Sequence, residues 1–173
     1  MKVLVFDTET SGLPTERNAS IYKTNMWPHI VQLSYIVYDT EHNELIGLED
    51  DYINIPDTVI MDPGSVEIHK ITSEQLRNGI TIVEALEKFN TCADKVDLII
   101  AHNVSFDKRM IMVEGIRNKI KMNIVDTYCT MKNSINCILC KSTWSCYNTK
   151  TFSFMYILLR SKCFTHQFVK FFP

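Results

Sequence analysis

Acidic side chains are missing from the last part of this chain. Residues 127–173 contain six Lys and Arg residues but no Asp or Glu, although a stretch of that length ordinarily holds about five acids. All 20 acids lie between Asp7 and Asp126, and residues 1–126 hold 12 of the 18 basic residues. That part therefore has a formal charge of −8, against −2 for the whole chain. The change in composition marks residues 127–173 as anomalous.

Long hydrophobic runs are also missing. Val3–Phe6 is too short for the core of a signal peptide, and Phe152–Leu159 is too short to span a bilayer. Five of the six cysteines lie at or after Cys129, whereas a secreted disulfide scaffold would spread them through the fold. We therefore predict a soluble protein of the cytoplasm or of another reducing, intracellular compartment.

What the chain does contain is typical of one globular domain. Of its 173 residues, 46% are hydrophobic and 22% are charged. Apolar segments rich in β-branched and aromatic residues predict five strands. These segments are residues 2–6, 29–39, 44–55, 96–101 and 122–125. The polar turn Thr40–Asn43 predicts that the second and third strands form an antiparallel pair.

Helices are expected between the later strands. Thr72 with Gln75 and Thr81 with Glu84 have the spacing of a capping box. Apolar residues then recur at helical spacing over residues 81–94 and 105–118. The order of three strands, helix, strand, helix and strand predicts an α/β domain with a mixed sheet.

Two carboxylates follow the first strand. Asp7 and Glu9 are two residues apart, so both can project from one side of the sheet. Unpaired acids are costly beside a buried strand, and a hard divalent cation would resolve that cost. The alternative is a solvated strand end.

A second polar group follows the fourth strand, where the sequence reads His102, Asn103 and, four residues later, Asp107. Ligand-binding groups in open α/β sheets gather at such strand ends. Asp107 would face Asp7 if the fourth strand pairs with the first, and three carboxylates could then hold two Mg²⁺ ions about 4 Å apart. Taken singly, Asp107 could instead be an acid of a first helical turn that interacts favourably with the helix dipole, and His102 could be a packed or surface histidine.

Together these motifs resemble a known family. Residues 6–13 (FDTETSGL) resemble the first motif of the DEDD exonuclease superfamily, and residues 102–107 (HNVSFD) resemble its second. Residues 68–72 (IHKIT) look like the segment that these proteins carry before their helical middle. The resemblance is to the DEDDh type, in particular to the exonuclease domain of the DNA polymerase III epsilon subunit.

This resemblance implies a ribonuclease-H-like fold, with a mixed five-stranded sheet flanked by helices and incomplete at the C-terminus. The exonuclease domain would cover residues 1–136, leaving residues 137–173 as an atypical tail. Asp7, Glu9 and Asp107 would be catalytic and would hold Mg²⁺ or Mn²⁺. The predicted substrate-binding residues are Thr10, Leu13, His102 and Asn103. Asp126 would be structural.

The family's third motif, a histidine base followed five residues later by a carboxylate, is not matched. His166 is the only histidine after His102, and Phe171 stands where the carboxylate should be. We consider three explanations: an out-of-frame or truncated tail, an inactive homologue that still binds nucleic acid, and a zinc-binding tail. Zinc would use Cys137, Cys140, Cys163 and His166, with free thiols as the alternative.

The predicted function is release of nucleotides from the 3′ ends of DNA, or of RNA, in proofreading or repair. The predicted partners are a single-stranded DNA 3′ end and a DNA polymerase subunit. The body of the chain offers no basic stripe, which an enzyme that holds only a few terminal nucleotides can tolerate. The alternative is a catalytically inactive or truncated homologue that binds nucleic acid or a polymerase.

Overall fold

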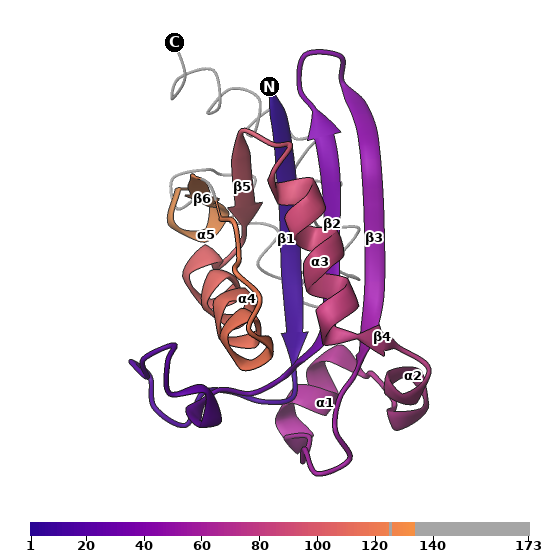
Figure 1. Ribbon diagram of the computed structural model, residues 1–173, viewed down its shortest axis with the longest axis vertical. Helices are drawn as coiled ribbons and strands as arrows, with labels where there is room; N and C mark the ends of the chain where they lie inside the picture. The colour runs from indigo at the N-terminus through magenta and orange to yellow at the C-terminus, as the bar shows by residue number, and fades with distance from the viewer. Residues whose placement is uncertain (125, 134–173) are drawn as a thin grey trace.

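The computed structural model describes residues 1–124 and 126–133. Six strands in this part form one mixed sheet in the order β4-β3-β2-β1-β5-β6 (Figure 1). The strands are β1 (Lys2–Thr10), β2 (Ile30–Asp39), β3 (Glu44–Asn54), β4 (Ile80–Thr81), β5 (Leu98–Ala101) and β6 (Thr127–Cys129). The helices are η1 (Thr24–Met26), α1 (Pro63–His69), α2 (Ser73–Arg77), α3 (Ile82–Ala93), α4 (Val104–Asn118) and α5 (Thr130–Asn133).

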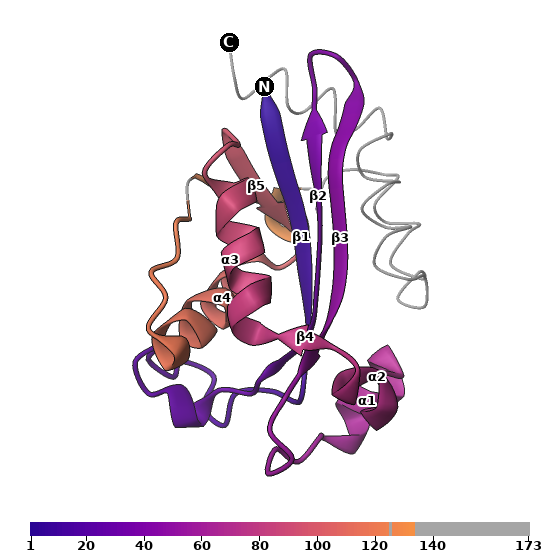
Figure 2. The ribbon, with the colours of Figure 1, turned by 45° about the vertical axis from the view of Figure 1, so that its right-hand side comes forward.

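Alternation along β1 gives the sheet two different faces. Leu4 and Phe6 belong to the large core that α3 and α4 complete, and Phe6 meets Phe89 of α3 edge to face at 5.3 Å between ring centroids. Figure 2 shows both helices on the same side of the strands. Val3 and Val5 point to the other face, where they form a separate buried cluster with strand residues such as Ile100. Asp7 and Glu9 share the parity of Val3 and Val5 along the strand.

The sheet is antiparallel on one side of β1 and parallel on the other. β1 pairs antiparallel with β2, and β2 pairs antiparallel with β3 through a short turn. At that turn the Asp39 carboxylate accepts hydrogen bonds from the backbone N–H groups of Glu41 and His42 at 2.9 and 3.3 Å. β1 pairs parallel with β5, so the carboxyl ends of these two strands lie at the same edge of the sheet. The condition for bringing Asp107 beside Asp7, a fourth strand paired with the first, is therefore met.

The helix starts follow the expected chemistry. Thr72 caps α2 with a complete capping box that includes Gln75. Thr81 caps α3 by accepting from the Glu84 N–H at 3.2 Å, which is one of the two hydrogen bonds of the predicted capping box. The α/β fold with a mixed sheet and helices at residues 82–93 and 104–118 is therefore confirmed.

The end of the domain differs from the sequence-based expectation. A fifth strand was expected at residues 122–125, but residues 122–124 form no strand, and the pairing next to β5 is made by β6 at Thr127–Cys129. Met122 instead packs its side chain against the core and lies within reach of Gly115, so its apolar character reflects helix packing. The sheet also has six strands rather than five, because Ile80 and Thr81 add a two-residue parallel strand beside Ile53. Nothing in the sequence pattern distinguishes so short a strand from a loop.

Among residues 1–124 and 126–133, no helix combines the length and the apolar character needed to cross a membrane.

Candidate active site

The candidate site begins where β1 extends past its parallel neighbour. The β1–β5 register ends with Val5 opposite Ile100, whereas β1 continues to Thr10. On the β5 side, the later residues of β1 have no strand partner among the described residues. The first turn of α4 provides a substitute there, because Asp107 Oδ1 accepts from the Thr8 N–H at 3.2 Å and from the Thr8 hydroxyl at 2.8 Å. Asp107 thus lies at the edge of the sheet, beside β1.

This contact brings the three predicted carboxylates together. Asp107 is only 3% exposed. Burial raises the pKa of Asp7 well above its usual range, and the charges of Asp107 and Glu9 raise it further. Burial, and then the charge of Asp107, also raise the pKa of Glu9. The pKa of Asp107 is raised by burial to about 6, although the hydrogen bonds from Thr8 oppose that change. Each carboxylate is therefore costly to ionise in the absence of a cation.

The donor set fits a divalent metal. Carboxylate oxygens are the ligands that Mg²⁺ and Mn²⁺ prefer, and among the described residues no ion pair involves Asp7, Glu9 or Asp107. Their ligand atoms do not all lie within 4.8 Å of one another, a spacing that Asp39, Glu41 and His42 do reach at the β2–β3 turn. Two ions about 4 Å apart share their ligands, so the site does not require all three carboxylates around one ion.

His102 and Asn103 connect β5 to α4. The half-buried His102 ring shares a hydrogen bond of 3.1 Å between Nδ1 and the Thr130 hydroxyl, and burial lowers its pKa. Its carbonyl accepts from the Met131 N–H at 3.0 Å. Asn103 is the N-cap residue of α4, but its side chain makes no capping bond and instead accepts from the Ser105 hydroxyl at 3.3 Å. The structure therefore places both residues at the strand end that also leads to Asp107.

The other two predicted residues, Thr10 and Leu13, flank the turn that follows β1. Thr10 is buried and donates its hydroxyl to the Gly12 carbonyl at 2.8 Å, so it shapes the turn. Leu13 projects outward with 78% of its surface exposed. Ser11 fixes the turn between them, because its backbone bonds to His29 and to Asp62, both at 2.8 Å. Leu13 thus has the accessibility that a contact to a ligand requires, while the Thr10 hydroxyl is already engaged.

Sequence analysis does not predict a buried ionic network that joins α4 of the site to the loop between β1 and β2. Glu114 of α4 is 2% exposed and pairs with Arg117 at 2.7 Å and with His29 at 3.2 Å. Arg117 also donates to the carbonyls of Pro28, Thr24 and Trp27. Helix α4, which carries Asp107, is thereby joined to the loop that leads from β1 to β2. The i,i+3 spacing of Glu114 and Arg117 was the only available signal, and it also describes many solvated pairs.

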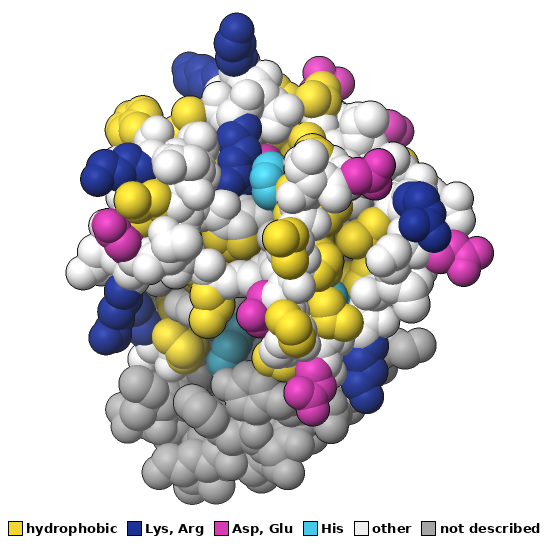
Figure 3. All heavy atoms as spheres, turned by 90° about the horizontal axis from the view of Figure 1, so that it is seen from below, with side chains coloured by type: hydrophobic (Ala, Val, Ile, Leu, Met, Phe, Trp, Pro, Cys, Tyr) yellow, Lys and Arg dark blue, Asp and Glu magenta, His cyan; other side chains and the backbone are white. Residues whose placement is uncertain are grey.

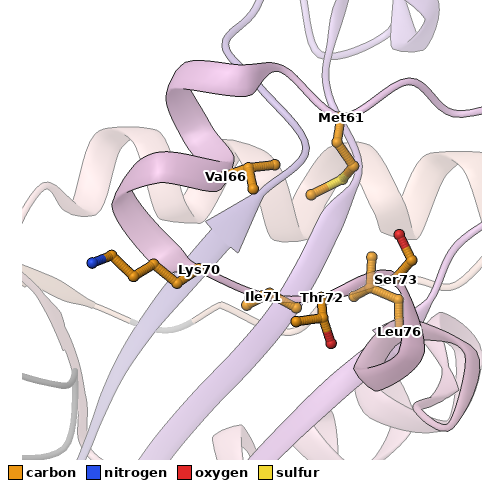
Figure 4. A pocket seen from close by; sticks show the side chains of 7 residues that line it. All are labelled: Met61, Val66, Lys70, Ile71, Thr72, Ser73 and Leu76. Atoms are coloured by element: carbon orange, nitrogen blue, oxygen red, sulfur yellow. The ribbon is translucent and has the colours of Figure 1, made fainter.

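Among the described residues, a hollow lined mainly by apolar side chains lies on the neighbouring surface. It measures about 390 Å³ and lies between α1, α2 and Met61 (Figure 4). Its lining residues are Met61, Val66, Lys70, Ile71, Thr72, Ser73 and Leu76. Figure 3 views the molecule from this end, where β1 finishes. Lys and Arg side chains of the described residues form no continuous stripe in this view.

The predictions for the tail lie outside the described residues. They concern residues 137–173, the zinc ligands Cys137, Cys140, Cys163 and His166, and Phe171 in place of a carboxylate. Asp126 lies within the described part, where its carbonyl accepts from the Ile99 N–H at 2.9 Å. That backbone contact is compatible with the structural part predicted for this residue.

Comparisons with known proteins identify the family of the chain. The family model RNase T, described as exonuclease, matches residues 4–145. The DNA polymerase III PolC-type of Mycoplasmopsis pulmonis is 28% identical over 110 residues, which cover 53% of this chain and 8% of that protein.

Solved structures show the same fold. E. coli exonuclease I in complex with a dA16 oligonucleotide has a TM-score of 0.61 at 17% identity, over 83% of this chain and 30% of that one. The zinc-bound complex of E. coli exonuclease I with single-stranded DNA has a TM-score of 0.64 at 18% identity, over 79% and 29% of the two chains. A full-length 3′-exonuclease has a TM-score of 0.54 at 10% identity, over 69% and 40%. This chain thus spans less than half of each of these relatives.

Proposed function

The chain belongs to the RNase T exonuclease family of the DEDD superfamily, and from that premise we propose that it removes nucleotides from the 3′ end of DNA. Family membership establishes the nuclease class. The polarity, the preference for DNA and the activity of this particular chain belong to the proposal.

One observation carries the proposal. The acids of the two family motifs meet at Thr8, where Asp107 accepts two hydrogen bonds and acts electrostatically on both Asp7 and Glu9. A purely structural site would neutralise such buried carboxylates with Lys or Arg, because unpaired buried charge is costly. The pKa values of these three carboxylates are instead raised, as is expected of groups that bind a cation.

We propose that Asp7, Glu9 and Asp107 hold Mg²⁺ or Mn²⁺. When bound, a pair of such ions activates water and stabilises the attacking and leaving oxygens of phosphodiester hydrolysis. The chain's own residues would bind and orient the end of the strand. Exposed Leu13 offers an apolar contact for the terminal nucleotide, Asn103 lies near the expected sugar and phosphate, and His102 borders the same strand end. Thr10 would act indirectly, by holding the turn that presents Leu13.

Single-stranded DNA is the substrate we favour. The structural neighbours from E. coli carry single-stranded oligonucleotides, and the absence of a basic stripe on the viewed face suits an enzyme that grips few phosphates. The match to a PolC-type polymerase supports a DNA polymerase as partner and a proofreading or repair setting inside the cell. We retain residues 1–136 as the exonuclease unit, although the family match continues to residue 145.

A nuclease assay tests this proposal. The substrate is a 5′-labelled single-stranded oligonucleotide, incubated with Mn²⁺ or with EDTA. We expect a ladder of products that shortens from the 3′ end, requires Mn²⁺ and disappears in Asp7→Ala. The matched control is Asp57→Ala, which removes an exposed acid far along the chain and should leave the ladder unchanged. Internal cleavage products would contradict the exonuclease assignment.

A second candidate follows from the composition of the tail. Residues 127–173 contain no acid, so they do not supply the family's fourth carboxylate. A homologue with three carboxylates could bind a DNA end or a polymerase without cleaving DNA. Fluorescence anisotropy with the same oligonucleotide distinguishes the two candidates. Binding by a folded protein that yields no ladder in Mn²⁺ would favour the binding module over the enzyme.

A further inference from the structure

A row of polar side chains crosses the sheet beside the candidate metal site. In the strand register, Asp7 of β1 lies opposite Ser34 of β2, and Ser34 lies opposite Asp50 of β3. Glu9 lies opposite Gln32 in the same way. Residues directly opposite each other in antiparallel strands share one face, with Cβ atoms about 4.5–5.5 Å apart. Ser34 and Gln32 are therefore the nearest cross-strand donors to the two catalytic acids on β1.

Both donors are turned away from those acids. The Ser34 hydroxyl donates to Asp50 Oδ1 at 2.6 Å, and the Gln32 amide Nε2 donates to the same oxygen at 2.6 Å. Ser34 is 2% exposed, so water offers its hydroxyl little alternative. Asp50 is exposed and, among the described residues, takes part in no ion pair. One oxygen of Asp50 therefore accepts the hydrogen bonds of both donors.

The direction of these two bonds matters for cation binding. A donor released from Asp50 would find a carboxyl group directly across the strand, and a carboxyl oxygen accepts hydrogen bonds in either protonation state. Each bond that Asp7 or Glu9 accepted in this way would use a lone pair that could otherwise coordinate a metal. Asp50 removes that competition because it holds the donors in the opposite direction.

We propose that Asp50 is a positioning residue of the metal site, which keeps Ser34 and Gln32 off Asp7 and Glu9 and so leaves their oxygens available to a divalent cation. This inference rests on the proposed function of those two acids. Asp50 itself touches neither the metal nor the substrate. Its contribution is the acceptor oxygen rather than the negative charge.

The neighbours of Asp50 on β3 provide a control. Asp51 has the opposite parity along the strand, and its carboxylate pairs with Lys88 of α3 at 3.3 Å. Asp51→Ala removes the same chemical group one residue away but leaves the two donors in place. A general effect of lost negative charge would appear in both variants, whereas the proposed effect appears only at position 50.

Mn²⁺ binding to the full chain tests the inference without a nuclease assay. Free Mn²⁺ is followed by electron paramagnetic resonance during titration of the wild type and of variants whose folding is checked by circular dichroism. We expect Asp50→Ala to weaken binding about tenfold, the lower end of the range known for residues that support metal ligands. Asp50→Asn retains an acceptor oxygen and should stay close to the wild type, as should Asp51→Ala.

Removal of the donors provides the rescue. The triple variant Asp50→Ala, Ser34→Ala and Gln32→Met has no hydroxyl or amide left to compete, and we expect its Mn²⁺ affinity to return toward that of the wild type. Unchanged binding in Asp50→Ala would overturn the inference. Asp50→Asn binding as weakly as Asp50→Ala would also overturn it, because charge and not acceptance would then be decisive.

Asp7→Ala separates this inference from the proposed function. If Asp7→Ala abolishes Mn²⁺ binding while Asp50→Ala does not affect it, the metal site stands and the part assigned to Asp50 is wrong. If the folded wild type shows no binding that depends on Asp7, the metal site and the inference fall together.

Discussion

The Thr8 hydroxyl donates to Asp107 Oδ1 over 2.8 Å, and the Thr8 N–H reaches the same oxygen at 3.2 Å. Residues 99 positions apart are thereby joined at the point where β1 extends past β5. Asp7 and Glu9 flank Thr8, so this contact sets where the acid on the helix stands relative to the acids on the strand.

Removal of the Thr8 hydroxyl should make Asp107 harder to ionise. That hydroxyl lowers the pKa of Asp107, which burial has raised to about 6. Thr8→Val keeps the branched shape and loses the hydrogen bond, so we expect the pH at which Mn²⁺ binding is half-maximal to rise. The measurement is Mn²⁺ titration between pH 5 and 8. Thr8→Ser keeps a hydroxyl and is the control, and an equal rise in Thr8→Ser would contradict this explanation.

The metal-free protein should lose stability as the pH rises through the range in which Asp107 ionises. The folded pKa of about 6 lies above the usual value of 3.8, so the folded state retains the proton longer than the unfolded state does. The stabilisation is complete below pH 3.8, declines as the pH rises and is lost above about pH 6. For this group it is on the order of 3 kcal/mol. Urea unfolding in EDTA measures the change, and Asp107→Asn should flatten it.

The stability that Asp39 and His42 give to the turn between β2 and β3 should also depend on pH. Hydrogen bonds from His42 and from the turn backbone lower the pKa of Asp39 to about 2, and Asp39 raises the pKa of His42. The Asp39 contribution is present above about pH 4 and is lost as the pH falls through about 2. The His42 contribution is present below its usual pKa of 6.5 and is lost as the pH rises through its folded value.

Thermal unfolding of His42→Ala tests this pair. The melting temperature of the wild type should exceed that of the variant by more at pH 5.5 than at pH 8.5. A difference between the two proteins that does not change with pH would show that the ion pair adds nothing to the turn.

Among the cationic side chains of α4, replacement of Arg117 should cause the largest loss of stability. Arg117→Met leaves the buried Glu114 carboxylate without its 2.7 Å partner and removes a donor from each of three loop carbonyls. Loss of one member of a buried pair costs about 3–5 kcal/mol. Urea unfolding at pH 7 measures the loss. The control is Arg109→Met on the same helix, which is exposed and should change the free energy of unfolding by about 0.5 kcal/mol or less.

The sequence predicts most of the frame that carries the site. The apolar run before Asp7 and the capping residues Thr72 and Thr81 depend on local periodicity and local hydrogen bonds, which can be read directly from the chain. The order of the elements predicts a mixed sheet, although it leaves open whether β1 pairs with β5. The motifs around Asp7 and Asp107 add the family, because their residue types and order are specific.

The sequence does not predict the contacts that depend on register. Nothing local indicates that Thr8 would meet Asp107, or that Ser34 and Gln32 would both turn to Asp50, because each contact requires the alignment of separate elements of the fold. The strand expected at residues 122–125 was wrong for a related reason. A mainly apolar segment of four residues describes a strand and a helix-packing segment equally well, and Met122 packs beside Gly115.

The extension of β1 past β5 also affects how the protein acquires its function during synthesis. Asp7 and Glu9 leave the ribosome about a hundred residues before Asp107, and contacts of such long sequence separation form slowly because a large loop must close first. A nascent chain would hold two of the three acids without the means to bind a cation. Gain of metal affinity could therefore serve as a reporter of completed folding, since it requires α4 to have docked against the free edge of β1.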